Sequence, residues 1–169
     1  MKKSLFFVVA LTLALSVKAM TWNPFKREGR VKPNTVILTG NYDESRILAE
    51  LAQFYTRQPV VLVSKNEDGT TKVFYMPNIK EASEIDAKDF VDLVNHIAPK
   101  RVIVLGNSDY VPANFIEQIR DKYPVIQIDG ADWSKNAGTL ALIIEEKSLK
   151  SKFDESIKTF YLNNPNRVE

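Results

Sequence analysis

The chain has 169 residues, a formal charge of +2 and no cysteine. This length fits one ordinary domain, and a folded chain of about 150 residues buries roughly 70% of its unfolded surface, so it needs no disulfides for stability. Without cysteine, the sequence excludes thiolate metal sites, a cysteine nucleophile and a lipid-modified N-terminal cysteine.

The first nineteen residues have the pattern of a secretory signal peptide. Lys2 and Lys3 precede an apolar run over residues 5–15, and residues 16–19 close it with a cleavage motif that ends at Ala19. The run is short for a permanent anchor, and no later segment reaches the roughly 18 apolar residues of a transmembrane helix. We therefore expect cleavage after Ala19 and export to the periplasm, the cell surface or the medium.

Removal of this segment changes the charge of the protein. It takes away three of the 23 basic residues and none of the 21 acidic ones, so a charge of +2 becomes −1. Because the basic character belongs to the discarded part, nucleic acid is not an expected partner.

The first half of the remaining chain begins with residues 20–34, whose prolines, glycine and basic residues are typical of a solvated linker. A β-branched strand over 35–39 then ends at Gly40, and apolar residues at helical spacing follow, with Asp43 as the expected N-cap. Residues 60–63 predict a buried strand. The turn Asp68-Gly69 leads to residues 72–76, a candidate hairpin strand.

The second half repeats the same unit of strand, glycine turn and helix. Asp86 is the expected cap of its first helix, which Pro99 follows. In order, the predicted elements are a helix to Ile97, a strand over 101–105, a helix over 112–119, a strand over 124–128, a helix over about 134–146, a last helix over 148–162 and a polar tail over 163–169.

Continuous apolar strands that alternate with amphipathic helices predict an α/β fold. A strand buried on both sides has no solvent face, so we expect a mainly parallel sheet with helices on both faces, in three layers. Residues 35–162 form the single predicted domain.

Three of the predicted strands run into a glycine, at Gly40, Gly106 and Gly130, and the first two of these glycines are each followed by asparagine. These turns should lie together at the carboxyl edge of the sheet, where open parallel sheets generally bind ligands. Each glycine also has a purely structural interpretation, because it permits a positive φ or a close approach of a helix.

The sequence offers little for metal, nucleotide or nucleophile chemistry. His96 is the only histidine, no Gly-x-Ser-x-Gly motif is present, and each glycine turn has one glycine where phosphate-binding loops need two or three. No calcium-binding loop pattern occurs. We therefore expect no catalytic triad, no metal site and no cofactor.

Carboxylates that follow the strands leave one enzymatic alternative open. A pair drawn from Asp43, Asp109, Asp129 and Asp132 would suit an envelope glycan hydrolase. Aspartate is also a favoured residue of turns and helix N-caps, and capping is the simpler interpretation.

The order of elements over residues 35–146 resembles the bacterial cell wall-binding repeat 2 module. Residues 36–43 resemble its first strand and helix start, residues 59–62 its second strand, Gly106-Asn107 its glycine pair, and residues 127–137 its last motif. Gln127 and Trp133 stand where that motif has arginines. The resemblance implies a single divergent module, and self-association of such a module is one expectation.

What the resemblance implies is non-catalytic attachment to a cell-wall or envelope polysaccharide. The carboxyl edge offers tyrosine and tryptophan rings that stack on sugars and asparagines that bond hydroxyl groups, which favours a neutral glycan. A protein-interaction domain of a secreted complex is the remaining alternative. The expected ligand-binding residues are Asn41, Tyr42, Asp43, Asn107, Tyr110, Asp132 and Trp133.

Overall fold

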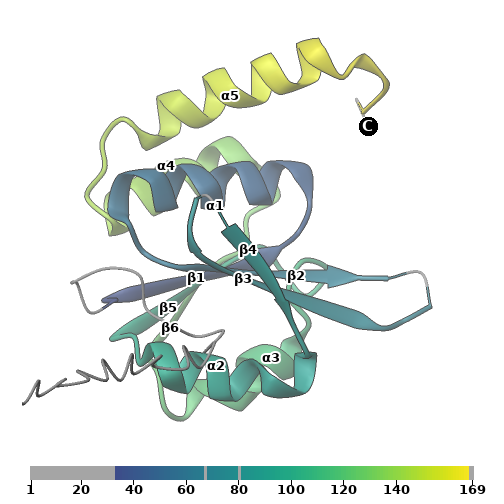
Figure 1. Cartoon of the computed structure of the whole chain (residues 1–169). Helices are drawn as coiled ribbons and strands as arrows, with labels where there is room; N and C mark the ends of the chain where they lie inside the picture. The colour runs from purple at the N-terminus through teal and green to yellow at the C-terminus, as the bar shows by residue number, and fades with distance from the viewer. Residues whose placement is uncertain (1–32, 67, 80, 168–169) are drawn as a thin grey trace, which may run out of the picture.

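The computed structural model describes residues 33–66, 68–79 and 81–167, so the predicted signal peptide and most of the predicted linker lie outside the described residues. The described chain forms a six-stranded sheet in the order β4-β3-β2-β1-β5-β6, flanked by helices (Figure 1). Four strands run parallel and two are antiparallel to their neighbours. The predicted α/β class with a mainly parallel sheet is confirmed.

The parallel part of the sheet comes from the apolar strands that the sequence predicts. They are β1 (Thr35–Gly40), β2 (Val60–Lys65), β5 (Arg101–Leu105) and β6 (Val125–Ile128). β1 pairs with β2 on one side and with β5 on the other, so the direction of winding reverses between β1 and β5. In open α/β sheets, the carboxyl ends of the strands at this switch point border a crevice that binds ligands.

Two antiparallel strands extend the sheet beyond β2. The predicted hairpin strand is present and longer than expected, as β3 (Thr71–Asn78), and its turn holds Gly69 at a φ of 81°. The edge strand β4 (Glu81–Ile85) was not predicted. Its mostly polar, exposed sequence shows no apolar run, because a strand at the sheet edge buries little side-chain surface.

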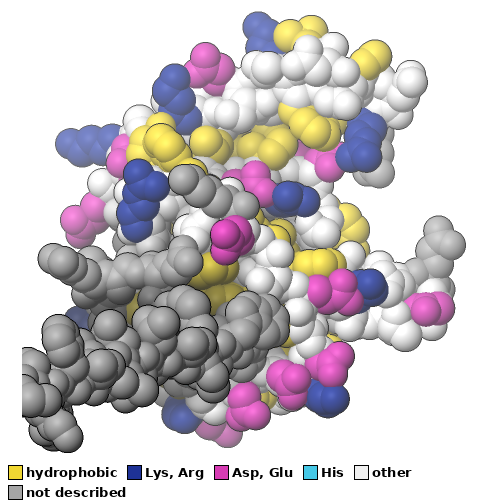
Figure 2. All heavy atoms as spheres, viewed as in Figure 1, with side chains coloured by type: hydrophobic (Ala, Val, Ile, Leu, Met, Phe, Trp, Pro, Cys, Tyr) yellow, Lys and Arg dark blue, Asp and Glu magenta, His cyan; other side chains and the backbone are white. Residues whose placement is uncertain are grey.

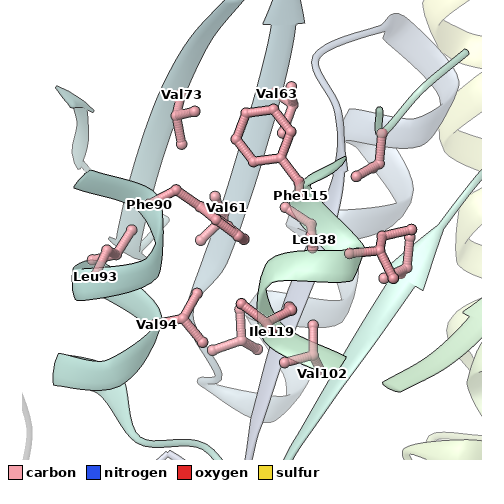
Figure 3. Packing of buried hydrophobic residues seen from close by; sticks show 14 of the residues in the cluster. Leu38, Val61, Val63, Val73, Phe90, Leu93, Val94, Val102, Phe115 and Ile119 are labelled. Atoms are coloured by element: carbon pink, nitrogen blue, oxygen red, sulfur yellow. The ribbon is translucent and has the colours of Figure 1, made fainter. Parts of the chain in front are cut away.

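Apolar side chains on the two faces of the sheet form two separate cores. Figure 1 places α2 (Phe90–Ile97) and α3 (Ala113–Arg120) on one side of the sheet, and α1 (Asp43–Thr56) and α4 (Trp133–Ile143) on the other. Successive residues of β1 alternate between the cores, as strand geometry requires. Figure 3 shows the first core, where Phe90 and Phe115 meet edge to face above Leu38 and Val61.

The last helix, α5 (Leu149–Asn163), lies outside α1 and α4 rather than on the sheet (Figure 1). Leu149 and Phe153 are buried in the second core and Ile157 packs against it, whereas most other positions of α5 are exposed. Figure 2 shows apolar side chains along the seam below this helix. No helix in the described part of the chain is long and apolar enough to cross a membrane.

Two of the predicted helix N-caps, Asp43 and Asp86, are wrong. Asp43 is the first residue of α1 and Asp86 precedes a short 3-10 turn, Ala87–Asp89, and neither helix start has a side-chain cap. Ser45 instead donates its hydroxyl to the carbonyl oxygens of Gly40 and Tyr42. Asp132 does cap α4, because its carboxylate accepts the backbone N–H of Lys135.

Candidate functional site

The three glycine turns lie together at the carboxyl edge of β1, β5 and β6, and two of them make room for tyrosine rings. A Cβ atom on Gly40 would lie 2.7 Å from the ring of Tyr42. Gly106 has a φ of 96°, and a Cβ atom there would lie 2.6 Å from the Cβ of Tyr110. These glycines therefore let tyrosine side chains cover the ends of the central strands.

Tyr42, Tyr110 and Trp133 form a continuous aromatic cluster over this edge. The rings of Tyr42 and Tyr110 meet edge to face at 5.2 Å, and those of Tyr110 and Trp133 at 5.0 Å. The indole Nε1 of Trp133 donates to the Tyr110 hydroxyl over 3.2 Å. Trp133 is buried while Tyr42 is 45% exposed, so Trp133 supports the cluster and Tyr42 presents it to solvent.

A pocket of about 690 Å³ opens beside these tyrosines, and we call it the tyrosine pocket. Residues at the end of β1, in the first turn of α1 and in the loop after β5 form one wall, and the C-terminal part of the chain forms the other. The lining residues are Tyr42, Asp43, Glu44, Asp109, Tyr110, Tyr161, Asn166 and Arg167. The pocket thus combines aromatic surface with groups that form hydrogen bonds, at the edge where the sequence predicts a ligand.

The C-terminal wall is fastened to α1 by an ion pair. Nη1 of Arg167, in the 3-10 turn Pro165–Arg167, donates to both carboxylate oxygens of Asp43 at 2.9 and 3.0 Å. Residues 163–169 were predicted only as a polar tail. The structure instead makes Asn166 and Arg167 part of the pocket.

A second cavity of about 420 Å³ lies under α5, and we call it the α5 hollow. Its lining residues are Glu44, Ala131, Asp132, Trp133, Ser134, Phe153, Asp154, Ile157 and Lys158. Of the seven predicted ligand-binding residues, three therefore lie in the tyrosine pocket and two, Asp132 and Trp133, in the α5 hollow.

The two predicted asparagines lie outside the walls of both cavities. The side-chain oxygen of Asn107 accepts the backbone N–H of Asp109 at 2.9 Å, and that of Asn41 lies 3.5 Å from a guanidinium nitrogen of Arg46. Asn107 thereby shapes the loop that carries Asp109 and Tyr110 into the pocket.

Two of the four carboxylates named for the enzymatic alternative, Asp43 and Asp132, have structural partners. Asp43 is engaged by Arg167, and the N–H of Lys135 holds the pKa of the Asp132 carboxyl below its usual range. A glycosidase acid needs the opposite shift, because it must carry a proton near neutral pH. Among the described residues, no group of three or more histidine, cysteine, aspartate or glutamate side chains could hold a metal ion.

The lowered pKa of Asp132 predicts a pH dependence of stability. The folded state favours the carboxylate, so this contribution is present above pH about 4 and is lost as pH falls through the folded pKa. Asp132→Asn keeps a capping oxygen without a titrating group. We expect its melting temperature to fall less than that of the wild type between pH about 5 and pH about 3. Equal losses in calorimetric scans would show that the cap does not depend on charge.

Comparison with protein-family models, curated proteins and solved structures finds no match.

Proposed function

We propose that this chain is an exported, non-catalytic module that binds a neutral glycan of the cell envelope in the tyrosine pocket. The observation that carries the proposal is the pocket itself, which sets three tyrosines among carboxylate, amide and guanidinium groups at the carboxyl edge of the sheet. Tyrosine gives an apolar face and a polar tip, a combination that suits a sugar ring with its hydroxyl groups.

The charge of the pocket favours a neutral ligand over an anionic one. The guanidinium of Arg167 is engaged by Asp43, and Glu44 and Asp109 add two further carboxylates to the wall. A polymer that carries many negative charges would meet a wall with more acidic than basic groups, which opposes its approach. Carboxylates, by contrast, accept hydrogen bonds from hydroxyl groups, and amides both accept hydrogen bonds from them and donate hydrogen bonds to them.

Two features of the sequence support an envelope location for this ligand. The predicted signal peptide would place the mature chain outside the cytoplasm, where envelope glycans are found. The resemblance to the cell wall-binding repeat 2 module points to the same class of partner.

The test is binding of the mature chain, residues 20–169, to purified cell-wall material and to soluble oligomers of N-acetylglucosamine. Tyr42→Ala removes the exposed ring of the pocket, and we expect its dissociation constant to rise about tenfold, the effect of losing about 1.4 kcal/mol at a central contact. Titration calorimetry measures the oligomers, and co-sedimentation measures the insoluble wall.

Phe54→Ala is the matched control. Phe54 is also an aromatic residue of the α1 region and is 48% exposed, but it contacts Tyr55 and Arg57 rather than the pocket. Its affinity should equal that of the wild type. Failure of the wild type to bind any of these glycans, or equal affinity of the Tyr42 variant, would contradict the proposed function.

A further inference from the structure

The tyrosine pocket and the α5 hollow are neighbours that share a wall. Glu44, in the first turn of α1, lines both cavities, whose volumes are about 690 and 420 Å³. The two cavities therefore border the same residue, along the same edge of the fold.

One face of α5 runs past both cavities. Phe153 and Ile157 line the hollow and Tyr161 lines the pocket, and these residues are spaced four apart, so they lie on one side of the helix. Eight residues of helix span about 12 Å, which is longer than one sugar ring. The floor opposite α5 is formed by the first turns of α1 and α4, at Glu44 and at Trp133 and Ser134.

The chemistry of the α5 hollow matches that of the pocket. The apolar lining of the hollow comes from both sides, from Trp133 opposite α5 and from Phe153 and Ile157 on α5, and polar groups border this lining. Ser134 and Asp154 both line the hollow, and the Lys150 ammonium donates to the hydroxyl of Ser134 at 2.7 Å and to the carboxylate of Asp154 at 2.6 Å. These side chains are already held in position, so a sugar bound there would meet a fixed set of hydrogen-bonding groups.

We propose that the α5 hollow is a second sugar subsite, continuous with the tyrosine pocket past Glu44, so that the ligand is a glycan chain and not a single sugar. This inference rests on the proposed function, because the tyrosine pocket is the first subsite. The dependence of affinity on ligand length distinguishes a single site in the tyrosine pocket from two connected subsites.

The experiment compares β-1,4-linked N-acetylglucosamine disaccharide and hexasaccharide as probes. The disaccharide fills one cavity and the hexasaccharide reaches both, so the wild type should bind the longer probe at least tenfold more tightly. Ala131→Trp places a large side chain at an exposed position of the hollow. We expect this variant to bind the disaccharide with the affinity of the wild type, and to bind the hexasaccharide no more tightly than the disaccharide.

Ala82→Trp is the control, since Ala82 is exposed on the edge strand β4 and lines neither cavity. This variant should still bind the hexasaccharide more tightly than the disaccharide. Lys158→Ala is a second variant of the hollow, at an exposed position of α5. It should lower the affinity for the hexasaccharide by about threefold and leave the affinity for the disaccharide unchanged.

The outcomes separate the two proposals. Equal wild-type affinity for both probes, or an Ala131 variant that weakens both probes equally, would overturn the second subsite and leave the tyrosine pocket as a binding site. A wild type that binds neither probe nor cell-wall material would overturn the proposed function, and the subsite with it.

Discussion

Replacement of Gly106 by alanine is expected to lower the free energy of unfolding by about 3 kcal/mol and to weaken glycan binding more than tenfold. The residue has a φ of 96°, a backbone conformation that L side chains rarely adopt. The new Cβ atom would also lie 2.6 Å from both Cβ and Cγ of Tyr110. These atoms are next to the backbone, so the loop after β5 must move to relieve the contact.

That movement connects stability to the site. Tyr110 lines the tyrosine pocket, meets Tyr42 edge to face and accepts the Trp133 hydrogen bond, so its displacement disturbs the whole aromatic cluster. Urea denaturation measures the first effect and titration with the hexasaccharide measures the second.

Gly69→Ala separates the backbone contribution from the steric one. Gly69 also has a positive φ, of 81°, but nothing lies within 4 Å of its Cβ position. In this variant the free energy of unfolding should fall only by the backbone conformational contribution, about 1 kcal/mol, and glycan affinity should stay at the wild-type value. Equal losses at the two glycines would show that Tyr110 does not constrain the turn.

Phe153→Ala is expected to cost about 4 kcal/mol, within the range for a fully buried phenylalanine. Phe153 is 2% exposed and lies with Leu149 and Ile157 on the side of α5 that packs onto the second core. Domains of this size are stable by only about 5–15 kcal/mol in total, so the variant should be marginal at 25 °C. Because α5 is held by few buried residues, we expect its amides to lose protection from hydrogen exchange first.

Glycan binding should be lost together with the packing of α5 on the second core. α5 carries Tyr161 into the tyrosine pocket and Phe153 and Ile157 into the α5 hollow, so a displaced helix removes one wall from each. Leu162→Ala, at a position of the same helix that is 72% exposed, should change stability by less than about 0.5 kcal/mol. Retention of full stability and protection in the Phe153 variant would show that α5 does not depend on this contact.

Local patterns in the sequence were enough for most of the fold. β1, β2, β5 and β6 are short apolar runs before or after glycine or proline, and hydrophobic burial on both faces of a parallel sheet produces that pattern directly. The unpredicted strand β4 has no such signal. It forms because β3 offers free backbone groups along its outer side, and backbone hydrogen bonds do not depend on side-chain polarity.

The site was predicted only in the parts that follow strands. Tyr42, Asp43 and Tyr110 come within five residues of the ends of β1 and β5, so chain connectivity places them at the carboxyl edge. Trp133 and Asn107 were expected to face a ligand. The structure packs most of Trp133 behind Tyr110, so that it borders the α5 hollow rather than the tyrosine pocket, and it gives Asn107 a turn-forming hydrogen bond. Packing and turn geometry use the same residue types as a ligand site.

By itself, the sequence determined the alternation of strands and helices, the edge at which the glycine turns gather and the near-neutral charge of the predicted mature chain, because each of these depends on neighbours in the chain or on composition. Only the tertiary structure decided what closes that edge. Asp43 and Arg167 are 124 positions apart, and no periodicity or turn signal connects residues at such a distance. Their contact follows from the docking of Phe153 and Leu149, which lays α5 over α1 and α4 and makes its far end a wall of the tyrosine pocket.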